Sequence, residues 1–186
     1  MKPHDYYLDL LYKHISNPKM IAHSLASEAV MRALARRFGE DEEAWGLAGL
    51  LHDLDVEITA ADPLRHGPEG AAMLRDEGLP PEVTEAIRMH NEKATGNEKR
   101  STLLQHALAA GETITGLVFA VALVYPDKKI SSVRPKSITK RMKEKLFAAS
   151  VCRETIRECE VIGIPLPEFA QLALNALAPI EEELGF

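Results

Sequence analysis

The spacing of apolar residues is the feature of this sequence that most restricts its fold. Between turn signals, nearly every segment places apolar residues three or four positions apart, and no segment alternates like a strand. This spacing gathers the apolar side chains on one face of a helix, and that face has to be buried. At 186 residues the chain is long enough to bury its own core, so we predict one all-α domain.

Capping and turn residues divide the chain into helices. Asn17 and Pro18 form an N-cap and first-turn pair for a long helix that Gly39 ends, and Ser101 is expected to cap an apolar central helix. The segment 92–100 is a polar loop. The predicted helices cover residues 4–15, 18–37, 41 to 53–55, 68–77, 81–90, 101–125, 136–160 and 167–184.

The central stretch, residues 101–125, is apolar enough to suggest a membrane span. Gln105, His106 and Glu112 interrupt it, and the uninterrupted part is too short, so a buried central helix explains it better. The start of the chain carries charges throughout and is not typical of a signal peptide. We therefore expect a cytoplasmic protein that does not bind membranes.

The two cysteines, Cys152 and Cys159, are seven residues apart on a predicted helix. Helical rise separates them by about 10 Å, which is beyond the reach of a disulfide. We expect both to be reduced, structural thiols.

The net charge of −6 argues against binding to nucleic acid polymers. The segment 127–145 is the local exception, with eight Lys and Arg residues against two acids. This run is either a solvated helix face or a positive rim that attracts an anionic substrate.

The stretch "GLAGLLHDLDVE" sets His52 and Asp53 inside a run of leucines. Burying both polar side chains there costs several kcal/mol unless a partner neutralises them. A hydrogen-bond network or a metal ion therefore has to accompany the pair.

Other imidazoles and carboxylates fall inside apolar helices or at their ends. An imidazole and carboxylate mixture suits Mn, Fe, Co, Ni or Zn rather than a dedicated Ca or Mg site. Taken singly each residue is a weak signal, because a lone His on a helix is more often a surface residue. The candidate ligands are His23, His52, Asp53, His66, His90 and Glu112, while His4, His14 and His106 are left as structural or solvated.

The order of these residues resembles that of the HD-domain metal-dependent phosphohydrolases, specifically a branch of small bacterial HD-domain proteins. The segments that carry the resemblance are "LLHDLDVE", "HGPEGAAMLRDEGLPPEVTEAI", "ITGLVFAVALVYPDKKI" and "FAASVCRE". It covers almost the whole chain and implies an HD-domain-like helical bundle over residues 1–186. The ligand-bearing region would be about 18–125, followed by a basic helical region over 126–186.

The resemblance also implies a ligand set. His23, His52 and Asp53 match three ligands of a first metal, and the fourth, usually an aspartate, falls on Glu112. His66 and His90 match the histidines that hold a second ion in some members, with Asp53 as the bridging carboxylate. The implied cofactors are one or two divalent transition metal ions, with two slightly favoured.

The corresponding activity is hydrolysis of a phosphate ester by metal-activated water, with Asp53 in the catalytic centre. Glu57 is a candidate to orient the water or protonate the leaving oxygen, or is simply a solvated glutamate, and Asp55 has no better claim. Candidates for binding the substrate phosphate are Lys93, Lys136, Lys140 and, with less weight, Arg153.

The expected substrate is a small phosphorylated metabolite or nucleotide, and the oligomeric state stays open. One alternative is a di-iron oxygenase of the inositol-oxygenase type, because ligands that suit two manganese ions also suit two irons. A second is a non-catalytic HD-like signalling module, which the glutamate at position 112 favours.

Overall fold

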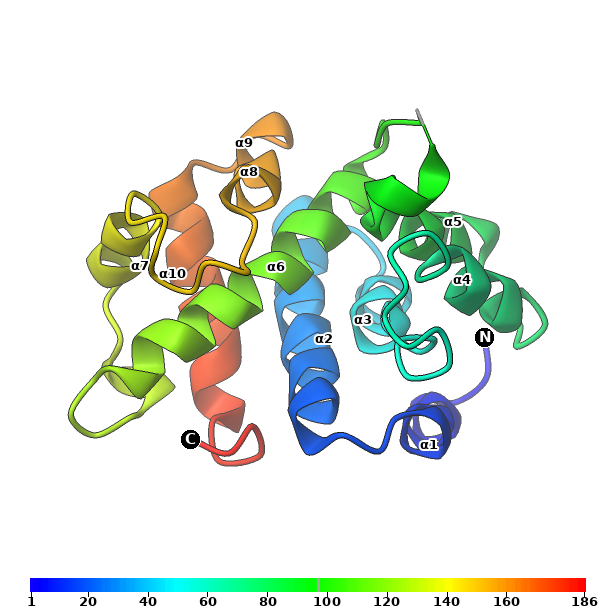
Figure 1. Cartoon of the computed structure of the whole chain (residues 1–186), viewed down its shortest axis with the longest axis horizontal. Coiled ribbons are helices and arrows are strands. Elements are labelled where there is room, and N and C mark those ends of the chain that lie inside the picture. The colour runs from blue at the N-terminus through cyan, green and yellow to red at the C-terminus, as the bar shows by residue number, and fades with distance from the viewer. Residues whose placement is uncertain (97) are drawn as a thin grey trace.

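The chain folds into helices joined by turns, as the apolar spacing predicts. The computed structural model describes residues 1–96 and 98–186, and within these ranges it contains no strand (Figure 1). The α-helices are α1 (His4–His14), α2 (Pro18–Phe38), α3 (Glu42–Leu51), α4 (Pro68–Arg75), α5 (Pro81–His90), α6 (Leu103–Leu123), α7 (Pro135–Arg141), α8 (Arg153–Ile156), α9 (Glu158–Val161) and α10 (Leu166–Leu177). The 3-10 helices are η1 (Glu92–Thr95), η2 (Ile130–Ser132) and η3 (Ala178–Ile180).

The helix α2 begins and ends where its capping residues predict. The Asn17 side chain accepts a hydrogen bond from the Lys19 N–H at 2.9 Å, Pro18 occupies the first turn, and Gly39 ends the helix at φ +73°. Glycine adopts this left-handed conformation without the steric penalty of a Cβ atom. The helix α2 packs most extensively against α3. The site described below takes His23 from α2 and His52 from the position directly after α3.

Helix α3 lies unusually close to α2. A Cβ atom at Gly49 would lie 2.5 Å from the carbonyl oxygen of Ser27, so only glycine permits this approach. The backbone of α2 therefore passes directly beside the last turn of α3.

Helix α6 is the predicted central helix. Its N-cap is Thr102 rather than Ser101, because Thr102 and Gln105 form a reciprocal capping box. The described part of the chain holds one helix, α6, that is long and apolar enough to cross a membrane. Most of its apolar window is buried against other helices of this chain, as in the core helix of a soluble protein. Figure 1 shows α6 crossing the molecule diagonally, in front of α2.

The C-terminal third differs from the prediction. The continuous helix over 136–160 is wrong: the chain turns through residues 142–152 between α7 and α8. The apolar pattern there is misleading, because Leu146 is 95% exposed and is not part of a buried stripe. The helix predicted over 167–184 ends at Leu177, and Pro179 follows in η3.

The structure also tests the predictions for the two cysteines and for the polar loop. Cys152 and Cys159 are both free, as expected, but they do not share a helix: Cys152 precedes α8 and is exposed, whereas Cys159 is buried in α9. The polar loop over 92–100 contains η1, and its residue 97 lies outside the described residues.

Candidate metal centre

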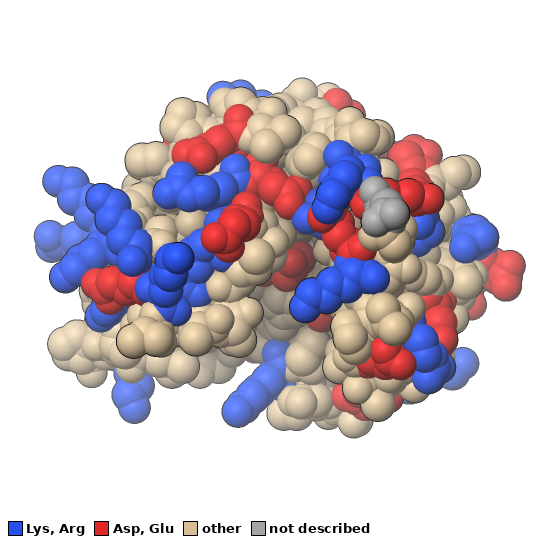
Figure 2. Space-filling model, turned by 45° about the horizontal axis from the view of Figure 1, so that its top comes forward, with Lys and Arg blue, Asp and Glu red and all other residues tan. Residues whose placement is uncertain are grey.

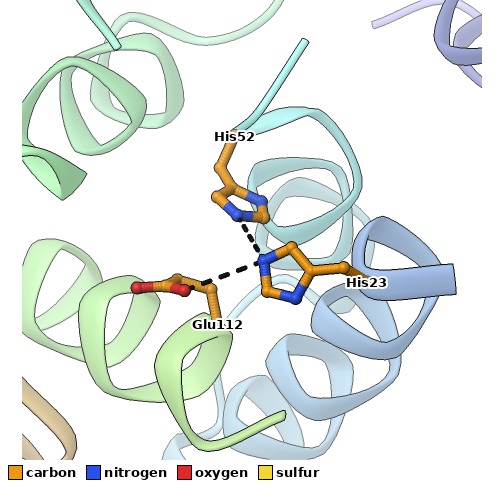
Figure 3. Close-up of side chains that lie close together, drawn as sticks. All are labelled: His23, His52 and Glu112. Atoms are coloured by element: carbon orange, nitrogen blue, oxygen red, sulfur yellow. Dashed lines mark hydrogen bonds and ion pairs between the residues drawn. The ribbon is translucent and has the colours of Figure 1, made fainter. Parts of the chain in front are cut away.

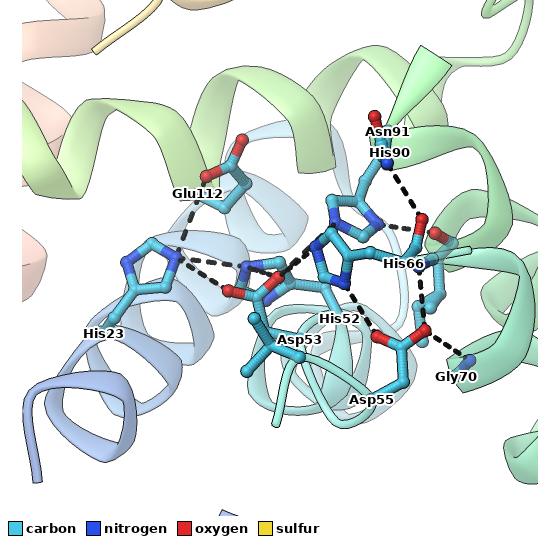
Figure 4. A network of polar contacts seen from close by, with 12 residues as sticks. His23, His52, Asp53, Asp55, His66, Gly70, His90, Asn91 and Glu112 are labelled. Carbon is cyan, nitrogen blue, oxygen red and sulfur yellow. Dashed lines mark hydrogen bonds and ion pairs between the residues drawn. The ribbon is translucent and has the colours of Figure 1, made fainter. Parts of the chain in front are cut away.

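His52 and Asp53 lie where α3 ends. The helix stops at Leu51, earlier than predicted, and the chain continues in turns from His52 to Ala61. Leaving the helix here lets both polar side chains face one centre while the preceding leucines remain in the core (Figure 4). His52 is 1% exposed and Asp53 is 8% exposed. Such burial requires nearly complete pairing of their polar atoms.

Asp53 lies at the middle of a cluster of imidazoles (Figure 4). Its Oδ1 atom is 3.3 Å from His52 Nε2, 3.1 Å from His66 Nε2 and 3.4 Å from His90 Nε2. Its Oδ2 atom is 3.7 Å from His23 Nε2. These histidines come from α2, the end of α3, the turn before α4 and the last residue of α5, so only the folded chain brings them together.

The candidate ligands form two groups of three. His23, His52 and Glu112 make up the first group, in which His23 Nε2 lies 3.1 Å from His52 Nε2 and 3.8 Å from Glu112 Oε2 (Figure 3). Asp53, His66 and His90 make up the second, with the two imidazole Nε2 atoms 3.1 Å apart. Within each group the possible ligand atoms all lie within 4.8 Å of one another. Asp53 also contacts both histidines of the first group and therefore joins the two.

Backbone carbonyl groups fix the orientation of two of the imidazoles. His52 Nδ1 lies 2.8 Å from the carbonyl oxygen of Gly49, and His90 Nδ1 lies 2.6 Å from that of Ile87. A carbonyl oxygen only accepts, so each Nδ1 carries the proton and donates it. Each Nε2 of the neutral ring is then a lone pair that faces the cluster.

In His23 too the proton lies on Nδ1, and here the acceptor is a hydroxyl group. Thr115 donates its hydroxyl proton to the Glu112 carbonyl oxygen at 2.6 Å, and its oxygen accepts from His23 Nδ1 at 2.9 Å. The lone pair of His23 Nε2 therefore also points inward. When both rings are neutral, these two lone pairs, 3.1 Å apart on His23 and His52, repel each other, and either a proton on one nitrogen or a metal ion beside them removes the repulsion.

Asp55 is a residue of the site to which the sequence analysis assigned no role. It is completely buried, its Oδ1 atom lies 2.8 Å from His66 Nδ1, and its Oδ2 atom accepts from the N–H groups of Gly67 and Gly70. A carboxylate behind a ligating histidine orients the ring and raises its basicity. The two-residue spacing of the acids in "HDLD" is the sequence signal that could have found it.

The donor set fits a divalent transition metal. Four imidazole nitrogens and two carboxylates converge, and the contacts behind three of the rings make their inward nitrogens acceptors. Imidazole and carboxylate ligands suit Mn, Fe, Co, Ni and Zn. A metal cation satisfies such a collection of acceptors when protons do not.

The burial and the close contacts in the cluster shift the pKa values of its ionisable groups. Burial, with the neighbouring His52, lowers the pKa of His23 to about 4, and burial raises the pKa of Glu112 to about 7. Burial opposes a charge on His66, but hydrogen bonds to Asp53 and Asp55 outweigh it and raise its pKa to about 10. Protons thus compensate the carboxylates in the metal-free site, and a bound cation supplies the same positive charge to neutral imidazoles.

A pocket of about 340 Å³ opens onto the cluster. His23, His90 and Glu112 line one side of it, and residues 150–152 with Thr155 line the other. The C-terminal third therefore supplies a wall of the site rather than a separate surface. Figure 2 shows a hollow in the middle of the face it presents, with acidic side chains inside the hollow.

The structure does not bring Glu57 into the cluster. Its carboxylate accepts hydrogen bonds from the N–H groups of Ser16 and Asn17, at 2.9 and 2.8 Å, and from the Ser16 hydroxyl. These contacts lower its pKa, the Asn17 N–H contributing most, and they tie the start of α2 to the turn after α3. Its geometry indicates a structural role and gives no support to a catalytic one.

None of the candidate phosphate ligands lines this pocket. Lys93, Lys136 and Lys140 are exposed and do not line it, and Lys140 lines a different pocket beside α6 and α7. Arg153 is committed to backbone carbonyl oxygens of the segment 144–151. The site has no lysine or arginine on its wall among the described residues.

The fold and this cluster define a class of helical metal-binding proteins. Residues 20–122 match the family model of the HD domain, and since they are more than half of the chain, the protein belongs to the HD domain family. HD domains bind divalent metals and are generally metal-dependent hydrolases, which agrees with the donor set.

A curated relative extends the comparison. Ribonuclease Y of Sulfurovum sp. (strain NBC37-1) is 26% identical over 148 residues, which are 78% of this chain and 28% of that protein. The chain thus spans less than a third of that relative's length. No solved structure matches the chain.

Proposed function

We propose that this protein is a metal-dependent phosphohydrolase that acts on a small phosphorylated metabolite or nucleotide. The observation that carries the proposal is the convergence of His23, His52, His66 and His90 on Asp53, with Glu112 at the edge. Membership of the HD domain family supports the same chemistry.

The two groups of ligands favour two ions. His23, His52 and Glu112 would hold one, and His66 and His90 the other, with Asp53 between them. Divalent ions bound in this way supply Lewis acidity toward a phosphoryl oxygen and lower the pKa of water toward neutrality. Mn, Fe, Co, Ni and Zn all suit the donor set.

The chain's own residues contribute orientation and charge. The Thr113 hydroxyl donates to Glu112 Oε1, which leaves Oε2 facing His23, and Thr115 holds the ring of His23 from behind. Asp55 holds His66 in the same way on the opposite side of the cluster. The ligands are therefore preorganised around the position that a substrate phosphate would approach from the pocket.

The volume of the pocket, about 340 Å³, favours a small substrate. The relative's name, Ribonuclease Y, makes an RNA phosphodiester the main competing substrate class. A short oligoribonucleotide therefore belongs in any substrate panel beside phosphomonoesters and nucleotides.

The first experiment is the metal content of protein purified without chelator, measured by mass spectrometry. We expect about two equivalents of a transition metal in wild type and a large loss in His52→Ala, while His14→Ala, on α1 outside the cluster, serves as the matched control. The metal found is then added to a panel of phosphate esters, nucleotides and a short oligoribonucleotide, with release of phosphate or cleavage as the readout.

The outcomes separate the competing functions. Hydrolysis of a small ester that is lost in His52→Ala supports the proposal, whereas cleavage of the oligoribonucleotide alone redirects it to RNA. Two irons, colour and O₂ consumption without hydrolysis would favour the oxygenase. Absence of metal even after reconstitution would favour a non-catalytic module and overturn the proposal.

A further inference from the structure

A second pocket adjoins the metal pocket. It has a volume of about 530 Å³ and is formed by the turns 142–152 and the start of α8. Ser150, Val151 and Cys152 line both pockets, so these three residues form a wall that the two adjoining open pockets share. We call it the basic pocket, after the side chains that line it: Lys143, Lys145, Arg153 and Arg157, with Glu154 as its one acid.

Some of the basic side chains that line the basic pocket form ion pairs and others do not. The Arg157 guanidinium pairs with Glu160 at 3.1 Å. Lys143 and Lys145 are exposed and have no ion-pair partner in the part of the chain that the structure describes. Two ammonium groups are therefore available to an anion beside the metal pocket, which itself has acidic and imidazole walls.

Arg153 holds the shared wall in place. Its guanidinium donates to the carbonyl oxygens of Ala148 and Val151, each at 2.6 Å, and to that of Phe147. No carboxylate takes part, and Ala148 adopts a left-handed φ of +45° within this turn. The turn is thus built around one arginine, which gives the wall a defined position between the two pockets.

We propose that the basic pocket binds a second anionic group of the substrate, through Lys143 and Lys145, while the scissile phosphate lies at the metal cluster. This inference rests on the proposed phosphohydrolase function and narrows its substrate class to small molecules with two anionic groups. The ligand at Lys143 and Lys145 is a phosphate or carboxylate, because ammonium groups attract such anions without selecting a base or sugar. Lys143 and Lys145 are then specificity residues, distinct from Lys136 and Lys140.

Cys152 allows a test that does not depend on activity. It is exposed and lines both pockets, whereas Cys159 is fully buried and protected from reagents. Iodoacetate is anionic and iodoacetamide is neutral, and both alkylate the same thiolate. The ratio of their rates at Cys152, measured on metal-free protein by mass spectrometry, reports the local attraction of anions.

We expect K143Q/K145Q to lower the iodoacetate-to-iodoacetamide ratio roughly threefold, because two positive charges near the thiol are lost. The control variant K128Q/K129Q removes the same net charge from exposed residues that line neither pocket. An unchanged ratio in K143Q/K145Q, or an equal fall in the control, would overturn the inference whatever the enzyme hydrolyses.

A matched pair of ligands tests selectivity. Adenosine 3′,5′-bisphosphate differs from adenosine 5′-monophosphate by one phosphate group, and we expect it to protect metal-loaded Cys152 from iodoacetamide at about tenfold lower concentration. K143Q/K145Q should abolish that preference and K128Q/K129Q should keep it. If the bisphosphate protects but neither compound is hydrolysed, the basic pocket stands and the hydrolase proposal needs another substrate. Equal protection by the two compounds in wild type would contradict the second anion site.

Discussion

The Asp55 carboxylate holds the His66 imidazole from behind, with Asp55 Oδ1 2.8 Å from His66 Nδ1 while His66 Nε2 lies 3.1 Å from Asp53 Oδ1. Asp55 is completely buried and is held in turn by two backbone N–H groups. One histidine is thus fixed between a carboxylate in the cluster and a carboxylate behind it.

The first prediction concerns Asp55→Asn. The amide keeps the shape of the side chain but removes the charge that raises the basicity of His66, so metal affinity should fall about 10–100-fold. Titration with the metal found in wild type measures this change, and circular dichroism checks that the helices persist. Asp76→Asn, at the end of α4, is the charge-matched control. Undiminished affinity in Asp55→Asn would assign the residue to stability alone.

The second prediction concerns the number of ions. His66 belongs to the group with Asp53 and His90, whereas the other group retains His23, His52 and Glu112. We therefore expect His66→Ala to bind about one equivalent of metal where wild type binds about two. Mass spectrometry under non-denaturing conditions counts the ions directly. Loss of both ions would show that the two groups bind as one unit.

The third prediction concerns pH and the metal-free protein. Burial raises the pKa of Glu112 from 4.5 to about 7, so the folded chain binds this proton more tightly than the unfolded chain does. The contribution to stability is complete below pH 4.5 and is lost as the pH rises through 7, a change of up to about 3 kcal/mol. The measurement is urea unfolding in the presence of chelator at pH 5 and at pH 8. Between these pH values the free energy of unfolding should fall more for wild type than for Glu112→Gln. Equal losses would contradict the shifted pKa.

The fourth prediction concerns the wall between the two pockets. Lysine cannot reproduce the several hydrogen bonds that the Arg153 guanidinium makes to carbonyl oxygens of the turn. In Arg153→Lys, amide hydrogen exchange over residues 144–151 should accelerate about tenfold or more, while exchange in α10 stays unchanged. Arg157→Lys, whose arginine makes an exposed pair with Glu160, is the control. Unaltered exchange would mean that the turn does not depend on Arg153.

The fifth prediction concerns the contact between α2 and α3. An alanine Cβ at position 49 would meet the Ser27 carbonyl oxygen at 2.5 Å, and backbone cannot move aside as a flexible side chain can. Gly49→Ala should destabilise the protein by about 1–3 kcal/mol and also weaken metal binding, because the Gly49 carbonyl oxygen orients His52. Gly46→Ala, in the same helix, is the control, because its Cβ atom would meet only the flexible side chain of Arg32, which can move aside. Equal stability of the two variants would refute the close contact as its cause.

Much of the fold was predictable because its signals are local. The start of α2 at Pro18, its end at Gly39 and the apolar core of α6 follow from capping chemistry and periodicity, which neighbouring residues carry by themselves. The helix over 136–160 was not predictable in this way. Its apolar residues share the helical period, yet Leu146 is exposed, and contacts of Arg153 with the turn replace helical hydrogen bonds.

The sequence by itself determined which residue types the centre contains, because His52 and Asp53, beside a run of buried leucines, require hydrogen-bonding or charged partners. Only the tertiary structure decided which of the acidic residues contact the histidines of the centre. Asp55 and Glu57 are equivalent acids in sequence, but the turn after α3 directs Asp55 to His66 and Glu57 to the start of α2. Contacts between residues distant in the chain depend on how the helices pack, and the spacing of residues along one helix carries no information about that packing.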